Sequence, residues 1–179
     1  GWCVWRGNEC KFAASCFTLD RGKPDLGLCS GVHGAVVAAS RKAGLKDANR
    51  IEFNPKTKQD VVYMMEGQEG KESTGGTLRL GDYPATLHKD SKVAQSYNAT
   101  NVIERHRHRY EVNQKFVHDI EKGGLVISGT SPDGRLVEFV EGSADSYFVA
   151  TQAHPEFKSR PLVTHPLFKG LIAACIDNK

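Results

Sequence analysis

A cysteine between an apolar stretch and a helix-like stretch is the first candidate for chemistry in this sequence. Residues 25–34 read DLGLCSGVHG, in which a short apolar run ends at Cys29 and a helical pattern begins directly afterwards. A sharp turn from a strand into a helix exposes the side chain at its centre and points the N-terminal amides of the helix toward it. Such amides lower the pKa of a thiol and can hold an oxyanion. The pattern therefore predicts a nucleophilic thiol at Cys29, and the alternative is a buried structural cysteine.

Two glycines flank this cysteine, and a possible base follows much later in the chain. Gly27 and Gly31 lie two residues to either side of Cys29 and suit the crowding that such a turn creates. A thiol nucleophile needs a base, and the base needs a group that orients it. The stretch TQAHPEF offers His154 at the end of an apolar run and Glu156 two residues on. A His-Pro-Glu turn is common by itself, so the fold must bring His154 to Cys29.

The elements that would position these residues alternate between helical and extended patterns. We expect helices at 8–24, 32–44, 115–124 and 165–179, with the first stopped by Gly22 and Pro24. We expect strands at 25–29, 61–65, 101–112 and 147–151, two short strands around a turn at 77–87, and a hairpin at 125–142 with Pro-Asp-Gly at its turn. The glycine-rich stretch 66–76 is expected to be a loop. This order favours one α/β domain with a central sheet.

Composition excludes several classes of function. The 179 residues carry a net charge of +3, which is too small to indicate nucleic-acid binding. No apolar run is long enough for a membrane span, so we expect no membrane partner. The five cysteines are odd in number and form no CxxC pair, which fits a cytoplasmic setting without disulfides. His106 and His108 lie two apart but have no third ligand nearby, so we expect no metal site.

Five longer stretches resemble one protein family. They read LGLCSGVHGAVVAASRKAGLKDANRIEF, GGTLRLG, ERHRHRYEVN, SGTSPDGRLVEFVE and FVATQAHPEFKSRP. They are similar to successive motifs of the glutamine amidotransferase (glutaminase) domain of the CTP synthase family, a class I glutamine amidotransferase. The resemblance runs from about Arg6 to the C-terminus. It implies a doubly wound, flavodoxin-like central sheet with an added antiparallel hairpin region. We expect residues 1–179 to form one such domain, truncated at its N-terminus and lacking its first strands.

The resemblance also assigns roles to single residues. Cys29 matches the thiolate that attacks the glutamine amide, His154 matches the base, and Glu156 matches the carboxylate that orients the base. Glu52 and Arg109 match positions that hold the α-ammonium and α-carboxylate groups of L-glutamine. Ser30, Gly31 and His33 follow the nucleophile and are expected to complete the glutamine site, where Ser30 supplies a backbone N–H to the oxyanion.

The family works as a larger enzyme. Its synthetase domain, which this chain is expected to lack, uses ATP and Mg²⁺ to aminate UTP to CTP with the ammonia that the glutaminase domain releases. GTP activates the reaction near the junction of the two domains, where GGTLRLG resembles a lid. The resemblance implies no cofactor in the glutaminase domain itself. It implies a tetramer for the full-length enzyme only, through the synthetase domain.

Two departures from the family pattern argue for slow turnover. The stretch GWCV places Trp2 where the family has a glycine-rich loop that contributes to the oxyanion site, and His33 replaces a glutamine that contacts the substrate. Two alternatives to an active glutaminase therefore stay open. One is a catalytically degraded binding or structural domain, and the other is a γ-glutamyl cysteine hydrolase of the same fold.

Overall fold

The computed structural model describes residues 15, 18, 20–64 and 79–177. Within these residues the strands are β1 (Asp25–Leu28), β2 (Asn49–Arg50), β3 (Asp60–Met64), β4 (Arg79–Leu87), β5 (Asn101–His108), β6 (Tyr110–Val112), β7 (Leu125–Thr130), β8 (Val137–Gly142) and β9 (Phe148–Thr151). The helices are α2 (Ser30–Lys42), α3 (Lys92–Tyr97), α4 (Val117–Lys122) and α5 (Pro166–Asp177), with short 3₁₀ turns η1 (Gln114–Phe116) and η2 (Pro155–Phe157). The expected amide loop around Trp2 and the expected loop at 66–76 lie outside the described residues.

Two sheets organise the described strands. The main sheet has six strands in the order β1-β9-β8-β7-β4-β5, and the smaller sheet has three in the order β2-β3-β6. In the main sheet β1 pairs with β9 in parallel, and the other described pairs are antiparallel. The expected α/β domain with a central sheet is confirmed, and the sheet is mixed, with one parallel pair, β1 and β9, among its described strands.

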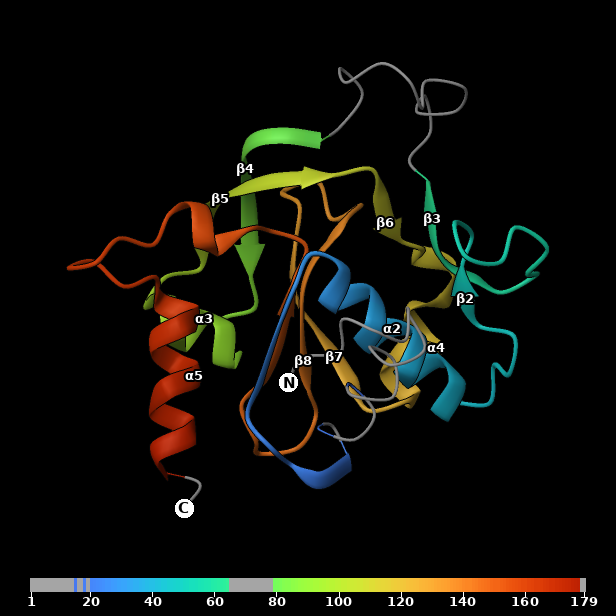
Figure 1. The fold of residues 1–179 in the computed structure, drawn as a ribbon, viewed down its shortest axis with the longest axis horizontal. Coiled ribbons are helices and arrows are strands. Elements are labelled where there is room, and N and C mark those ends of the chain that lie inside the picture. Colours follow the sequence, from blue (N-terminus) through green and yellow to red (C-terminus); the bar gives the residue numbers. More distant parts are fainter. Residues whose placement is uncertain (1–14, 16–17, 19, 65–78, 178–179) are drawn as a thin grey trace.

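Helices cover both faces of the main sheet. Figure 1 shows α2 and α4 together on one side and α3 and α5 together on the other, and each pair is in contact. One apolar core lies under α2 and α4 and includes Val36, Ile120 and Phe148. A second core lies under α3 and α5 and includes Phe139 and Leu167. Alternate residues of the strands between them supply both cores because successive side chains of a strand point to opposite faces.

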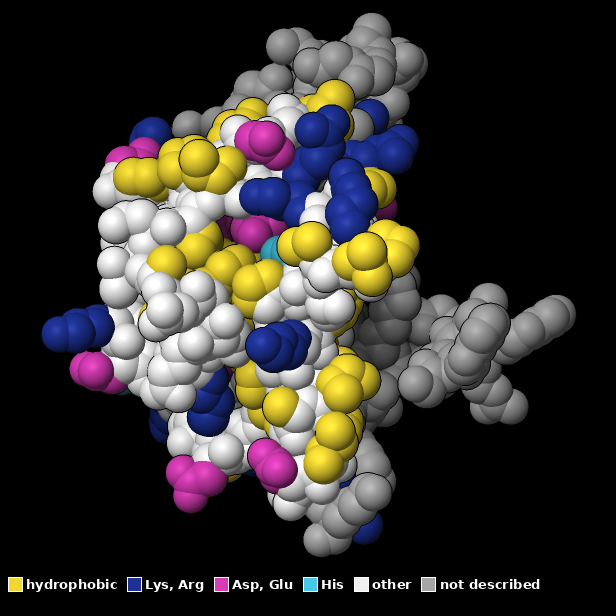
Figure 2. Space-filling view, turned by 90° about the vertical axis from the view of Figure 1, so that its left-hand side faces the viewer, with side chains coloured by type: hydrophobic (Ala, Val, Ile, Leu, Met, Phe, Trp, Pro, Cys, Tyr) yellow, Lys and Arg dark blue, Asp and Glu magenta, His cyan; other side chains and the backbone are white. Residues whose placement is uncertain are grey.

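The side of the molecule that carries α5 keeps apolar side chains in contact with solvent. Figure 2 shows this side, with hydrophobic and basic side chains interspersed across it. Ile172 and Ile176 of α5 are 59% and 60% exposed. The predicted closing helix at 165–179 is confirmed over Pro166–Asp177.

The prediction of two short strands at 77–87 is wrong for the described part of that range. Residues 79–87 form one strand, β4, which bends strongly in Figure 1 and contains Gly81 at φ +111°. The N–H of Leu87 donates to the carbonyl of Thr100, on the β5 side, at 2.7 Å. Because N–H groups alternate in direction along a strand, position 84 faces away from β5. β4 pairs with β7 only at Thr86 and Leu87. Pro84 therefore removes no ladder hydrogen bond, and the strand continues through it.

Other predicted elements agree with the structure. The hairpin at 125–142 is β7 and β8, with Gly134 at φ +73° in its turn. The expected strand over residues 101–112 is divided into β5 and β6, and α4 follows through η1. In β5 the burial alternates strictly, so that His106 and His108 are buried and share a face. The expected helix at 8–24 lies mostly outside the described residues, and its described part is helical as far as Arg21.

Candidate active site

Cys29 lies at the sharp turn between β1 and α2. Its backbone has φ 50° and ψ −103°, a positive φ that non-glycine residues seldom adopt. The turn is held from both sides, because the Cys29 N–H donates to the Thr151 carbonyl at 2.8 Å and the Cys29 carbonyl accepts from the Val32 N–H at 3.1 Å. A strained residue that the surrounding structure fixes in this way is typical of a nucleophile elbow. The predicted strand–nucleophile–helix turn is therefore present.

The two flanking glycines differ in what surrounds them. A Cβ at Gly27 would lie 2.9 Å from the Cβ of Ala150 and 3.1 Å from the backbone carbon of Gly31. A Cβ at Gly31 would meet no described atom within 4 Å. Crowding at the elbow thus explains Gly27, as expected, but the same explanation is wrong for Gly31.

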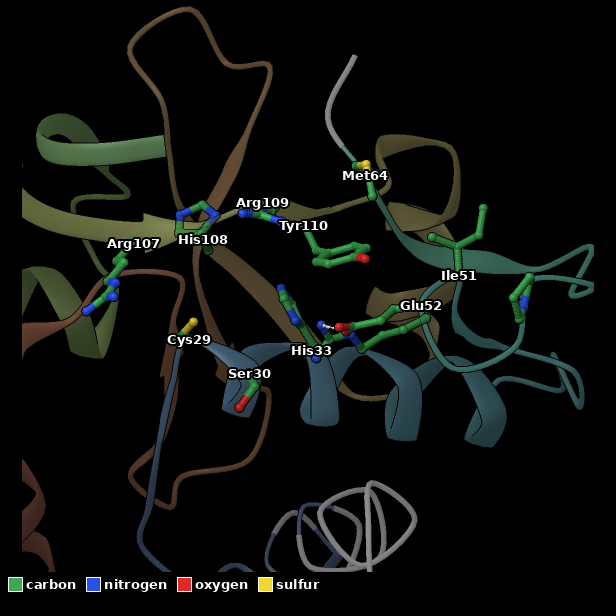
Figure 3. A pocket seen from close by; sticks show the side chains of 12 residues that line it. Cys29, Ser30, His33, Ile51, Glu52, Met64, Arg107, His108, Arg109 and Tyr110 are labelled. Carbon is green, nitrogen blue, oxygen red and sulfur yellow. Dashed lines mark hydrogen bonds and ion pairs between the residues drawn. The ribbon is translucent and has the colours of Figure 1, made fainter. Parts of the chain in front are cut away.

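A cavity of about 780 Å³ opens beside the elbow (Figure 3). Its lining residues come from the elbow, the smaller sheet and the β5–β6 junction: Cys29, Ser30, His33, Arg50, Ile51, Glu52, Pro55, Met64, Arg107, His108, Arg109 and Tyr110. Figure 3 shows Cys29 and Ser30 at one end, Ile51 and Glu52 at the other, and His33 between them. The Glu52 side chain extends back toward His33, so the thiol and the carboxylate both line the same cavity.

Five of the residues predicted from the sequence line this cavity, and three do not. Those that line it are Cys29, Ser30, His33, Glu52 and Arg109. The three outside the lining are Gly31, His154 and Glu156. Gly31 is the second residue of α2, and the other two follow β9.

His154 and Glu156 form a pair at the same sheet edge as Cys29. β1 and β9 run parallel as neighbours, with Leu28 opposite Thr151, so Cys29 and His154 both leave the carboxyl ends of adjacent strands. Nδ1 of His154 lies 2.5 Å from Oε1 of Glu156. Nε2 of His154 is buried and makes no hydrogen bond to a described residue. The carboxylate that orients the base is therefore in contact with the imidazole. A hydrogen bond between Nε2 and the thiol stays a prediction, because catalytic hydrogen bonds often form fully only when substrate binds.

The charged groups that line the cavity differ in their pairing. Glu52 forms an ion pair with Arg50, whose guanidinium lies 4.4 Å from the centre of the Phe53 ring and 5.0 Å from that of Tyr110. Burial lowers the pKa of Arg50 from its usual value, and the Glu52 charge opposes that shift. Arg109 has a buried Nε with no hydrogen-bond partner among the described residues. A buried guanidinium N–H without an acceptor is costly, so Arg109 is suited to bind an anion from the cavity.

His33 contributes a neutral imidazole to the cavity. It is 2% exposed, and both of its ring nitrogens are buried, close to Gln152 and to the backbone of Tyr110. Burial lowers the pKa of His33 well below its usual value, and the nearby positive charge of Arg50 adds to the shift. The imidazole therefore lines the cavity as a neutral group.

Arg50, His108 and Tyr110 also line the cavity, and the sequence analysis did not identify them as site residues. Arg50 lies two residues before Glu52, and alternation along an extended chain places such residues on one face. That spacing in RIEF was the available signal for Arg50. No spacing could reveal the stacking of Arg50 on Tyr110, because these residues meet only through the pairing of β2 with β3 and of β3 with β6.

Two further properties concern the described part of the chain alone. Within it, no group of three or more His, Cys, Asp or Glu side chains is arranged to hold a metal ion. The helices among these residues are too short or too polar to cross a membrane.

Comparisons with known proteins agree with this geometry. The model of the family "Glutamine amidotransferase class-I" matches residues 5–174. CTP synthases from Mycobacterium tuberculosis and Nocardia farcinica are 52% and 53% identical over 97% of this chain, which spans 31% of their length. The solved glutaminase domain of Trypanosoma brucei CTPS, with bound acivicin, has a TM-score of 0.88 and 35% identity, covering 99% of this chain and 69% of that one. The chain therefore belongs to the class I glutamine amidotransferases and, among them, to the glutaminase domains of CTP synthase.

Proposed function

We propose that this domain hydrolyses L-glutamine through Cys29, His154 and Glu156 and supplies the ammonia for the amination of UTP to CTP. One observation carries the proposal. One cavity is lined by the strained Cys29, by Glu52 and by Arg109, whose buried Nε has no hydrogen-bond partner among the described residues. Glutamine has a matching shape, with a reactive amide at one end and an ammonium and a carboxylate at the other.

The reaction uses the thiol as nucleophile. The Sγ thiolate of Cys29 forms a bond to the amide carbon of glutamine, and the negative charge moves to the amide oxygen. The backbone N–H of Ser30, in the first position of α2, is placed to stabilise that oxyanion. The C–N bond then breaks as the His154 imidazolium gives its proton to the leaving nitrogen, which releases ammonia and leaves a glutamyl thioester.

A water molecule completes the cycle. His154 takes a proton from the water, whose oxygen bonds to the thioester carbon, and the C–S bond breaks to release glutamate and the thiolate. Glu156, at 2.5 Å from Nδ1, keeps the imidazole oriented and stabilises its protonated form in both steps.

Arg109 and Glu52 are proposed to hold the amino-acid end of glutamine. The Arg109 guanidinium accommodates the α-carboxylate, because its buried Nε has no other acceptor among the described residues. Glu52 takes the α-ammonium in exchange for part of its contact with Arg50. His33 lies between the two ends and can hydrogen-bond to the substrate as a neutral group.

The rest of the reaction is proposed to take place on a synthetase domain. There ATP, with Mg²⁺, phosphorylates UTP, and ammonia displaces the phosphate to give CTP, ADP and phosphate. GTP is proposed as an activator of the coupled reaction, and a tetramer is proposed for the complete enzyme, in the cytoplasm. The support is the identity of 52% to CTP synthases of which this chain spans 31%.

The test separates the two nitrogen sources in a protein that also carries the synthetase domain. The Cys29→Ala variant is expected to lose CTP formation from glutamine and to retain CTP formation from added ammonium. The matched control, Cys175→Ala, changes an exposed cysteine of α5 and should leave both activities as they are. Glutamine-dependent CTP formation by Cys29→Ala at the unaltered rate would overturn the proposal.

A further inference from the structure

Five buried ionisable side chains, one of which lines the cavity, form a network of contacts. The network consists of Arg79, His106, His108, Glu111 and Glu138. Each of them is at most 7% exposed, and the two carboxylates are fully buried. Charged groups are rarely buried to this extent without a specific role, because removing them from water is costly.

The contacts within this buried network close on themselves. Arg79 bridges the carboxylates, with Nη2 at 2.6 Å from Oε1 of Glu138 and Nη1 at 3.6 Å from Oε1 of Glu111. On the other side, Nε2 of His106 lies 3.7 Å from Oε2 of Glu138, and Nδ1 of His108 lies 3.4 Å from Oε1 of Glu111. Nδ1 of His106 lies 2.8 Å from Nε2 of His108, so the five side chains form a closed ring of contacts.

The hydrogen-bond directions in the network are fixed by Gln152. Its Nε2 donates to the backbone carbonyl of Tyr110 at 2.9 Å, which identifies that atom as the amide nitrogen. The same nitrogen lies 3.2 Å from Nδ1 of His108, so Nδ1 accepts and the proton of His108 is on Nε2. Nε2 of His108 then donates to Nδ1 of His106, whose own proton is on Nε2 and faces Glu138.

The electrostatics agree with these directions. Burial lowers the pKa of His106 to about 2 and that of His108 to about 3, and the Arg79 charge adds to both shifts. Burial raises the pKa of Glu111 to about 8, and the Glu138 charge adds to that shift. At neutral pH the network therefore holds two neutral imidazoles, and the Arg79 guanidinium faces two carboxyl groups whose pKa values are both raised by burial.

The network joins the two sheets that enclose the cavity. Arg79, His106 and Glu138 come from β4, β5 and β8 of the main sheet, while Glu111 comes from β6 of the smaller sheet. The main sheet carries the elbow, and the smaller sheet leads through β2 into Glu52. In the sequence, Arg109 directly follows His108 and lies two residues before Glu111. The buried contacts of His108 and Glu111 therefore restrain the backbone on both sides of Arg109.

We propose that the buried network positions Arg109 and the smaller sheet against Cys29, and so sets the fit of the amino-acid end of glutamine. The inference rests on the proposed glutaminase function. His108 lines the cavity, and the charge of His154 contributes to the lowered pKa of both His106 and His108. The proposed role of the network is nevertheless positional, because it acts on glutamine through Arg109 and the smaller sheet. Loosening it should weaken binding of the amino-acid end more than it slows the chemistry at the thiol.

The experiment measures inactivation by acivicin, an electrophilic glutamine analogue that keeps the α-amino and α-carboxylate groups. In Glu138→Gln, which removes the charge that Arg79 faces, the inhibition constant KI is expected to rise about five- to tenfold. The inactivation rate constant kinact should stay within about twofold of the unaltered protein. The matched control is Glu141→Gln, a buried carboxylate of β8 that accepts from the Val93 N–H at 3.3 Å and lies outside the network.

A second measurement needs no variant and covers the case in which Glu138→Gln does not fold. Nitrogen-15 NMR of the unaltered protein should show His106 and His108 neutral and protonated at Nε2 from about pH 5.5 to about pH 8. Protonation at Nδ1, or titration of either histidine in that range, would overturn the network. An unchanged KI in folded Glu138→Gln, or an equal rise in Glu141→Gln, would overturn the positioning role. Failure of the unaltered protein to react at Cys29 would instead overturn the proposed function, and the NMR result would still decide the hydrogen-bond directions.

Discussion

His154 and Glu156 are in contact through Nδ1 and Oε1 at 2.5 Å, while Nε2 of the same imidazole is buried and makes no hydrogen bond to a described residue. One nitrogen is thus held by a carboxylate, and the other is left to act on a group that arrives with the substrate or with a small movement of the thiol. Pro155 begins the 3₁₀ turn η2 between them, and the His154 N–H donates to the Arg105 carbonyl at 2.8 Å. The pair is therefore fixed by backbone contacts as well as by its own hydrogen bond.

Glu156→Gln should slow the chemistry at the thiol. An amide cannot stabilise the protonated imidazole as a carboxylate does, so kinact for acivicin is expected to fall about 100-fold or more, with little change in KI. Glu121→Gln replaces an exposed carboxylate of α4 and serves as the control. If kinact of Glu156→Gln equals that of the control, Glu156 does not orient the base.

Replacing Gly27 and Gly31, the glycines on either side of Cys29, by alanine should change the unfolding free energy in opposite directions. In Gly27→Ala the new Cβ would lie 2.9 Å from Ala150, so β1 must move away from β9, and unfolding free energy is expected to fall by about 1–3 kcal/mol. In Gly31→Ala the new Cβ meets no described atom within 4 Å. The better helix propensity of alanine should therefore raise the unfolding free energy by about 0.5–1 kcal/mol. Urea unfolding of both variants checks this, and a Gly27→Ala protein as stable as the unaltered chain would contradict the close packing.

The pH dependence of stability should reverse near neutrality. The pKa of Glu111 rises from 4.5 to about 8 on folding, so the folded state binds the extra proton and its stability falls as pH rises between these values. The pKa of His106 falls from 6.5 to about 2 and that of His108 to about 3, so these groups remove stability as pH falls below 6.5. Burial shifts His33 in the same direction. Above pH 6.5 the histidine contribution ends, and the Glu111 contribution continues.

Glu111→Gln isolates the carboxyl contribution. Between about pH 6.5 and about pH 8, the unaltered protein should lose up to about 2 kcal/mol of unfolding free energy relative to this variant. Thermal or urea unfolding at several pH values measures the difference. A difference that stays constant over this range would show that Glu111 is already ionised in the folded protein at pH 6.5.

The sequence allowed the local parts of the site to be predicted, because their signals are short-range. The elbow at Cys29 follows from an apolar run that ends where a helical pattern begins, and the hairpin at 125–142 follows from its Pro-Asp-Gly turn. The strand β4 was mistaken for two strands because Gly81 and Pro84 are turn residues in most contexts. The strand can continue through Pro84 because position 84 faces away from β5. This direction depends on how β4 pairs with β5, which a local sequence pattern does not show.

The long-range parts of the site were beyond local reasoning. Glu52 and Arg109 were identified through the family resemblance, since an exposed pair is the simpler interpretation of such residues. The ion pair of Glu52 with Arg50 and the contact of Arg79 with Glu138 require strand pairings across both sheets. The sequence shows that His106 and His108 share a face of a strand, but their contacts with Glu138 and Glu111 also depend on strand pairing.

The central claim is that Cys29 is the nucleophile of a glutamine site, and the most direct measurement is the mapping of an acivicin adduct by mass spectrometry. We predict one adduct, on Cys29, which excess glutamine prevents and whose formation His154→Ala slows by about 100- to 10,000-fold. The exposed thiol of Cys175 should remain unmodified under the same conditions. Modification of Cys175 or another cysteine with Cys29 intact, or labelling of Cys29 that glutamine does not prevent, would contradict it.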